Sequence, residues 1–138
     1  MQPHYKLRDW IPIDKLNQGL SKNPNPYAIH LLEQNPEKIN WVELSANPNA
    51  IHLLEQRLKQ FNWFTSNDVD WCVLSNNPNA IPILEANLDK VNWSSLCRNK
   101  NPRILPLLKK NKNKIDWKRL SSNPIAIKMG IGPSPNCN

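Results

Sequence analysis

The tryptophans of this chain recur at a nearly constant interval, and that interval constrains the fold more than any other feature. Three pairs are 22 or 24 residues apart: Trp41 and Trp63, Trp71 and Trp93, and Trp93 and Trp117. Self-similarity with such a period is typical of repeat proteins, in which each module buries its apolar face against its neighbours. We therefore expect a stacked array of modules.

Other positions repeat together with the tryptophan. The pattern is apolar-(Asn/Asp)-Trp-x-x-Leu-(Ser/Cys)-x-Asn-Pro-x-Ala-Ile-x-Leu-Leu-Glu. The apolar position holds Ile39, Phe61, Val91 and Ile115. The Leu position holds Leu20, Leu44, Leu74, Leu96 and Leu120. The Asn-Pro pair falls at Asn25-Pro26, Asn47-Pro48, Asn77-Pro78, Asn101-Pro102 and Asn123-Pro124. In this alignment two extra residues precede the pair in 20–26 and 96–102, and in WFTSNDVDW an insertion places Trp71 eight positions after Trp63.

Asn directly before Pro is a typical helix start, because the Asn side chain accepts a bond from a free N–H and Pro at the first position loses none. This predicts one helix from about Pro48, with Ala50, Ile51 and Leu54 on one face. It also predicts a second helix from Pro36.

The second helix of the other modules is expected to begin at Leu58, Leu88 and Lys112. Pro82 and Pro106 stand at the fifth position after their caps, where each would remove a backbone bond, so in those two modules Asn-Pro forms either a cap or a turn. Helices this short are not stable alone. The predicted fold class is therefore all-α, an α-solenoid of short two-helix repeats of about 22 residues.

We expect one domain, with an N-terminal cap at 1–19, the repeat array at 20–129 and a flexible C-terminal tail at 130–138. The residues predicted to form its structural core are Trp41, Trp63, Trp93, Trp117, Leu44, Leu74, Ile51 and Ile81.

Four segments carry a family resemblance: LSKNPNPYAIHLLEQNPEKINW (20–41), LSANPNAIHLLEQ (44–56), LSNNPNAIPILEAN (74–87) and LSSNPIAIK (120–128). They resemble the short Asn-Pro/Trp repeats in proteins of giant DNA viruses related to the mimivirus group. The resemblance spans about residues 20–129 and is weakest in 96–117. It implies a helical repeat protein of largely unassigned role, and a structural or host-interaction component in the host cytoplasm or the virus particle.

The sequence also indicates in which cellular compartment the protein is expected. The sequence has neither an apolar stretch near the roughly 20 residues of a membrane span nor the apolar run of a secretory signal near its start. Cys72, Cys97 and Cys137 show no C-x-x-C spacing, so we expect reduced thiols and no zinc site. These observations predict an intracellular protein that is neither secreted nor inserted in a membrane.

The basic residues are concentrated at one end. Residues 98–138 hold ten basic and one acidic residue, a net charge of +9, whereas the other 97 residues hold eight basic and ten acidic. The predicted binding residues are Arg98, Lys100, Arg103, Lys109, Lys110, Lys112, Lys114, Lys118 and Arg119. Such a face can bind nucleic acid phosphates, an acidic protein or an anionic surface. The alternative is a solvated lysine face produced by an A/T-rich codon bias.

Individual side chains have two interpretations each. Trp117, next to the lysines, suits base stacking, but its place in the repeat predicts core packing. His30 and His52 occupy equivalent positions and are expected to form an exposed ladder with nearby glutamates, with too few ligands for a metal. Asp68 and Asp70 form either a polar loop or a site.

Nothing in the sequence indicates catalysis, a cofactor or a small-molecule substrate. Cys97 fills a position that is Ser in other modules, which predicts a small, partly buried residue. We expect a non-enzymatic repeat scaffold that mediates protein–protein interaction or self-association, since the last module stops at MGIG without an obvious polar cap. The alternative is nucleic-acid or other polyanion binding through the basic C-terminal repeats.

Overall fold

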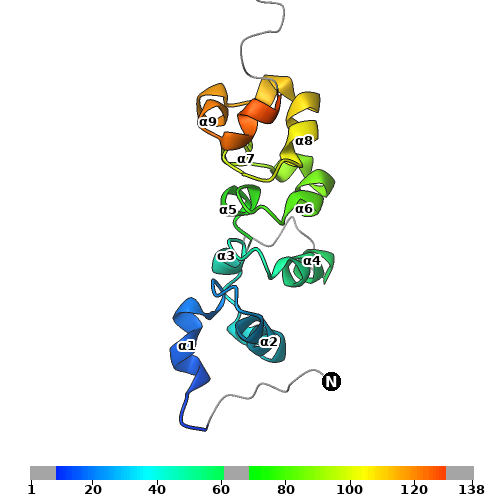
Figure 1. The fold of residues 1–138 in the computed structure, drawn as a ribbon. Helices are drawn as coiled ribbons and strands as arrows, with labels where there is room; N and C mark the ends of the chain where they lie inside the picture. Colours follow the sequence, from blue (N-terminus) through cyan, green and yellow to red (C-terminus); the bar gives the residue numbers. More distant parts are fainter. Residues whose placement is uncertain (1–8, 61–68, 130–138) are drawn as a thin grey trace, which may run out of the picture. The chain divides into compact units, whose positions relative to one another are not determined.

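The computed structural model describes residues 9–60 and 69–129, and the contacts divide the chain into two compact units, Met1–Asp70 and Trp71–Asn138. Every regular element in these described residues is helical, with nine α-helices and four 3-10 helices (Figure 1). The all-α prediction is confirmed. In the described part of the chain, no helix has the length and apolar character needed to cross a membrane.

The two units contain similar successions of short helices. In unit 1 the elements are α1 (Ile13–Leu20), α2 (Pro26–Gln34), η1 (Pro36–Lys38), α3 (Trp41–Leu44) and α4 (Ile51–Gln60). In unit 2 they are α5 (Trp71–Ser75), α6 (Ile81–Ala86), η2 (Leu88–Lys90), α7 (Trp93–Leu96), α8 (Ile104–Lys110), η3 (Lys112–Lys114), α9 (Trp117–Ser121) and η4 (Pro124–Met129). The tail predicted at 130–138 lies outside the described residues.

The second helices predicted from Pro36, Leu88 and Lys112 are not continuous, and Leu58 lies inside α4 and starts no new helix, so that prediction is wrong. After the 3-10 turn η1, Ile39 and Asn40 have extended backbones, and a new helix, α3, begins at Trp41. The reason is a cap: the Asn40 side chain accepts a hydrogen bond from the Glu43 N–H at 3.2 Å. Asn92 and Asp116 cap α7 and α9 in the same way.

The first helix starts later than predicted in the module with Asn47-Pro48, and in the modules with Pro82 and Pro106 the Asn-Pro pair forms the turn and not the cap. Residues 47–50 form a turn in which the Ala50 N–H donates to the Asn47 carbonyl, and α4 begins at Ile51. The turn that the sequence allows for the modules with Pro82 and Pro106 therefore also occurs at residues 47–50. Among the described α-helices only α2 begins at the proline, with Asn25 as its cap, and the 3-10 helix η4 begins at Pro124. Pro82 is tolerated because it lies in the first turn of α6, where N–H groups lack helical partners.

The termini of the longer helices follow the positions of asparagine. Asn35, Asn87 and Asn111 each stand three residues after a buried leucine and donate a side-chain bond to the carbonyl four residues back. The helices α2, α6 and α8 end directly before these residues. Arg57 occupies the same position in the second module, and α4 continues to Gln60.

Leucines, and not tryptophans, form the centre of the core. The fully buried leucines of the two repeated positions are Leu32, Leu44, Leu54, Leu74, Leu84, Leu96, Leu108 and Leu120. Ile81 is buried as well, whereas Ile51 is half-buried. Trp63 lies outside the described residues, and Val69 and Trp71 occupy the positions that the sequence alignment gave to Phe61 and Trp63.

The assignment of Trp117 to the core is wrong, because the residue is 55% exposed. Trp41, Trp71, Trp93 and Trp117 are each the first residue of a short helix. Trp41 and Trp93 are half-buried, and cations lie over their rings, Arg57 at 4.9 Å and Lys114 at 5.1 Å from the ring centroids. Arg57 and Lys114 each come from a later part of the chain than the ring they cover. The corresponding segment after Trp117 lies outside the described residues.

Buried asparagines join successive modules. Asn99 is fully buried, and its amide donates to the carbonyls of Ser75 and Asn77, both at 3.0 Å. Its side-chain oxygen accepts the Asn101 N–H, also at 3.0 Å. Both N–H donors of the amide and its oxygen are thus hydrogen-bonded, as is usual for a buried polar group. Asn47 and Asn123 make the same three bonds to their own neighbours.

This contact, which we call the asparagine latch, fixes the alignment of the modules. The latch residue always stands three positions after a core leucine, as in Leu44 and Asn47 or Leu96 and Asn99. Asn99, not Asn101, is therefore the equivalent of Asn47. The two extra residues of 20–26 and 96–102 follow the latch residue and do not precede it, which corrects the alignment made from Asn-Pro pairs.

A second polar contact runs to the next module along the chain. The Ser75 hydroxyl donates to the Trp71 carbonyl at 2.7 Å and accepts the Asn92 N–H at 2.9 Å. The hydroxyls of Ser21 and Ser45 accept equivalent N–H groups. Cys97 takes this position once, and its buried thiol accepts the N–H of Asp116.

We expect substitutions to separate the core leucines from the exposed indole. Leu96→Ala should lower the free energy of unfolding by about 3 kcal/mol, because it leaves a cavity at a fully buried site. Trp117→Ala should cost less than about 1 kcal/mol, because the residue is already more than half exposed. Urea unfolding followed by circular dichroism measures both. Equal losses would contradict the leucine-centred core.

The latch predicts a large cost for a nearly isosteric change. Asn99→Asp replaces two donors by a carboxylate oxygen facing two carbonyl oxygens, and should destabilise the fold by about 3 kcal/mol. The matched control is Asn76→Asp, at an exposed position, which should stay within about 0.5 kcal/mol of the parent. Urea midpoints compare the two, and similar midpoints would refute the latch.

Candidate functional site

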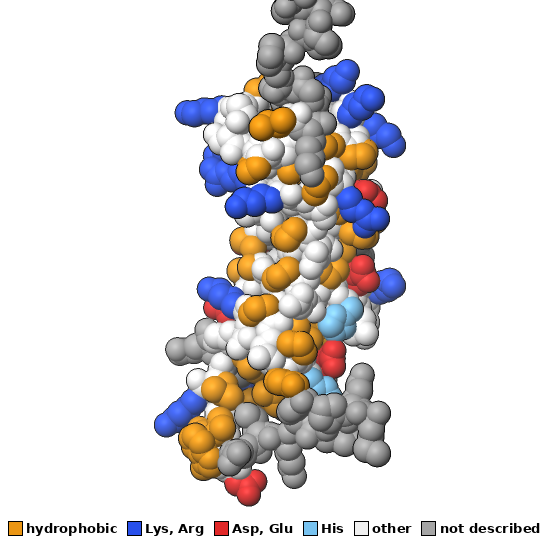
Figure 2. All heavy atoms as spheres, in the orientation of Figure 1, with side chains coloured by type: hydrophobic (Ala, Val, Ile, Leu, Met, Phe, Trp, Pro, Cys, Tyr) orange, Lys and Arg blue, Asp and Glu red, His pale blue; other side chains and the backbone are white. Residues whose placement is uncertain are grey.

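The charge of the chain is divided unequally between the two units. Unit 2 contains eleven basic and three acidic residues, a net charge of +8, whereas unit 1 contains seven basic and eight acidic, a net charge of −1. In unit 2, Lys and Arg side chains gather over α8 on one margin and over α7 and α9 on the other (Figure 2). The nine basic residues predicted from the sequence all lie in this unit.

The first group of cations lies at the end of α8 and in the turn after it. Lys109 and Lys110 are in the last turn of α8, and Lys112 and Lys114 are in η3. All four are exposed. Cations are favoured at a helix C-terminus, where carbonyl groups carry partial negative charge. The helix predicted to begin at Lys112 is only a three-residue turn, so Lys112 does not stand at the positive end of a longer helix.

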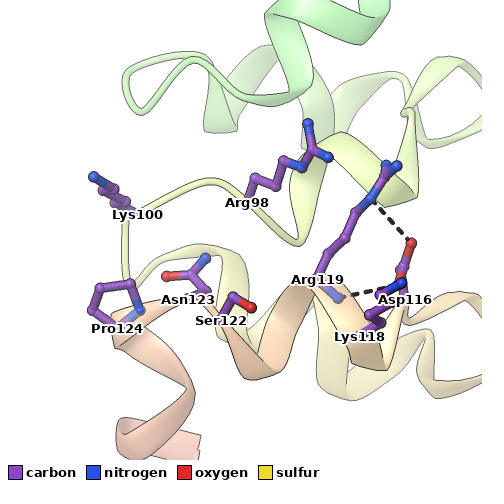
Figure 3. Close-up of a pocket in the computed structure, with 8 residues that line it drawn as sticks. All are labelled: Arg98, Lys100, Asp116, Lys118, Arg119, Ser122, Asn123 and Pro124. Atoms are coloured by element: carbon purple, nitrogen blue, oxygen red, sulfur yellow. Dashed lines mark hydrogen bonds and ion pairs between the residues drawn. The ribbon is translucent and has the colours of Figure 1, made fainter.

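The second group lines a pocket of about 490 Å³, drawn in Figure 3. Arg98 and Lys100 come from the segment after α7, and Lys118 and Arg119 come from α9. The remaining lining residues are Asp116, Ser122, Asn123 and Pro124. Among the predicted cations, Arg103 belongs to neither group and immediately precedes α8.

An asparagine latch brings these segments together. The amide of Asn123 donates to the Cys97 carbonyl at 2.9 Å and to the Asn99 carbonyl at 2.7 Å. This places the segment that carries Arg98 and Lys100 directly beside the end of α9. Arg98 and Lys100 flank the buried Asn99 and are both exposed, so the same backbone segment supplies a structural contact and two cations.

Among the described residues that line this pocket, Asp116 is the only acidic one. The hydrogen bond from the Ser94 hydroxyl, at 2.8 Å, and then the Arg119 N–H hold the pKa of its carboxyl below the ordinary value. Its side chain lies 3.5 Å from the Arg119 guanidinium Nε. The carboxylate is thus ionised and neutralises Arg119.

Three cations of the pocket lack such an acidic partner. Within residues 9–60 and 69–129, neither Arg98, Lys100 nor Lys118 forms an ion pair with an acidic side chain. Like charges held near one another raise the local potential and attract anions. The pocket is therefore suited to an anionic group, and the Ser122 hydroxyl can donate to it.

Unit 1 contains a different arrangement, built around Glu33. One carboxylate oxygen lies 2.7 Å from His52 Nε2, and the other lies 3.7 Å from His30 Nδ1. The expected histidine ladder therefore runs through Glu33. Among the residues that the structure describes, no group of three or more His, Cys, Asp or Glu side chains is placed to hold a metal ion.

A second pocket, of about 580 Å³, adjoins this ladder. Apolar side chains of α2 and α4 line part of it, including Leu32 and Leu53, and Trp41 with its stacked Arg57 lines another part. Asp68 and Asp70 are the two residues predicted to form either a polar loop or a site. Asp68 lies outside the described residues, and the Asp70 backbone N–H donates a hydrogen bond to the Ser45 hydroxyl.

None of the protein-family models, curated proteins or solved structures compared with the chain matches it. The resemblance to the repeats of giant-virus proteins therefore rests on the sequence motif alone.

The cysteines offer a chemical check of this geometry. Burial raises the pKa of the Cys97 thiol, and the hydrogen bond from the Asp116 backbone offsets this in part. The thiolate is the reactive form, so Cys97 should stay unmodified by iodoacetamide at neutral pH while the exposed Cys72 is alkylated. Mass spectrometry of a Cys137→Ser variant measures both sites. Equal labelling of the two under native conditions would contradict the buried position of Cys97.

Proposed function

We propose that this chain is a non-enzymatic α-solenoid scaffold that binds an anionic macromolecule through unit 2. The asparagine latch supports the scaffold, because the same three bonds recur between successive modules in the same register. Repeated interfaces of one geometry are the basis of solenoids, whose extended surfaces serve recognition.

The observation that carries the anionic partner is the pocket beside α9. It holds four cations and a single acid that is already paired with one of them. The alternative, a solvated lysine face, gives no reason for these cations to line one pocket. An anion bound in the pocket would contact several of them at once. A bound polyanion releases its counterions, so its affinity depends strongly on salt.

A protein partner is the second candidate, favoured by the pocket of unit 1. Apolar Leu32 and Leu53 lie there beside charged Glu33 and Arg57. Protein interfaces combine an apolar centre with a polar rim in this way. A partner held there would serve the protein–protein role that the sequence predicts.

Matched charge removal tests the anion-binding proposal. In Lys100→Gln/Lys118→Gln, two cations of the pocket are lost, and in Lys15→Gln/Lys59→Gln, two exposed cations of unit 1 are lost. Fluorescence anisotropy with labelled heparin, polyglutamate and oligonucleotide measures affinity. The first variant should bind about tenfold more weakly, with a salt slope shallower by about 2, because two contacts to the polyanion are lost.

The control variant has the same net charge and should bind within about twofold of the parent. Equal losses in the two variants would show that net charge alone attracts the polyanion. Absence of binding to all three probes would refute the proposal. A protein partner bound to unit 1 would be retained by the Lys100/Lys118 variant.

A further inference from the structure

Trp117 differs from Trp41 and Trp93, which are half-buried under a cation, in a way that bears on the ligand. The residue is more than half exposed, and it immediately precedes Lys118, which lines the basic pocket. Exposed tryptophan is energetically unfavourable, since it leaves a large apolar surface in solvent. An exposed aromatic next to several cations is the combination on which bases stack in proteins that bind single strands.

Trp117 is not among the residues that line the pocket, but it lies on the same short helix as Lys118 and Arg119, which do. The helix has five residues, so its axis is about 7.5 Å long. Trp117 is its first residue, and Ser122, directly after its end, lines the pocket. The backbone positions of Trp117 and Ser122 are therefore close enough for the two residues to reach adjoining nucleotides of one strand.

Hydrogen bonds hold the start of α9 against α7. The Ser94 hydroxyl donates to Asp116 at 2.8 Å and accepts a bond from the Arg119 guanidinium. Ser94 follows Trp93, and Asp116 precedes Trp117, so the N-terminal ends of the two helices are tied together. The stacking residue is thus presented on a fixed element, which lowers the entropy lost on binding.

We propose that α9 and the segments beside it form a binding site for single-stranded nucleic acid. In this site Trp117 stacks on one base, and Arg98, Lys100 and Lys118 contact the phosphates of the adjoining nucleotides. The inference rests on the proposed polyanion binding and narrows its ligand to one class.

Two other anionic ligands fit the observations less well. An acidic peptide can neutralise the three cations, but its carboxylates provide no flat aromatic surface for the indole. A duplex provides the phosphates, but its bases are stacked on each other and covered on both faces. Only a single strand uses the cations and the exposed ring together, and stacking makes such binding tolerant of base sequence.

The test compares two exposed tryptophans. Trp117→Ala removes the proposed stacking residue, and Trp10→Ala removes a tryptophan of unit 1 that is 77% exposed. Binding of labelled single-stranded oligo-dT and oligo-dA is measured by anisotropy, with polyglutamate and a duplex as competing ligands. We expect Trp117→Ala to lose about tenfold in affinity for the single strands and to keep its affinity for polyglutamate. Trp10→Ala should match the parent.

A second variant separates stacking from any change in the fold. Trp117→Phe keeps an aromatic face and should retain most of the affinity that Trp117→Ala loses. Quenching of tryptophan fluorescence by the oligonucleotide should persist in Trp10→Ala and fall in Trp117→Ala. Unfolding in urea confirms that the three variants are folded.

The outcomes distinguish this inference from the broader proposal. If single strand and duplex bind equally, and Trp117→Ala changes neither, the site takes a polyanion without stacking and the inference is overturned, while polyanion binding stands. If polyglutamate binds and oligonucleotides do not, the ligand is an acidic protein. If neither binds, both proposals fail.

Discussion

The amide of a buried asparagine is the contact on which the rest of this structure depends. Its two donors satisfy two backbone carbonyls of the preceding module, and its oxygen satisfies an N–H of its own turn. Helices of four to ten residues leave many backbone groups without helical partners. A module this short is stable only if neighbouring modules satisfy those groups, and the latch does so while the leucines beside it exclude water.

Much of the fold follows from the sequence because its determinants are local. The Leu positions, the Asn caps and the repeat period can be read directly from the sequence. The leucines at those positions are buried. The alignment failed because Asn-Pro looked like the invariant pair, whereas the invariant feature is an asparagine three residues after the core leucine, with or without proline, as at Asn99. A hydrogen bond to a carbonyl more than 20 residues away leaves no local pattern to read.

The tryptophans show the opposite error. Their regular spacing predicted burial, but regularity only requires an equivalent environment, and that environment is the first residue of a short helix. There an indole is shielded by a cation from elsewhere in the chain, as Lys114 shields Trp93, or is exposed, as in Trp117. The interpretation of Trp117 as a stacking residue, set aside because of its place in the repeat, therefore regains its physical basis. The cations were visible in the sequence, but their division into two groups was not.

Codon bias accounts for an abundance of Asn and Lys without accounting for where they lie. A buried Asn99 whose amide makes three hydrogen bonds is selected by its environment, since an unpaired amide there would be costly. The same turn directs its two neighbours, Arg98 and Lys100, to the surface. The latch of the next module, Asn123, then sets them beside α9. The basic pocket is thus a product of the contact that joins successive modules, and the residues on either side of the latch set the charge of the surface beside it.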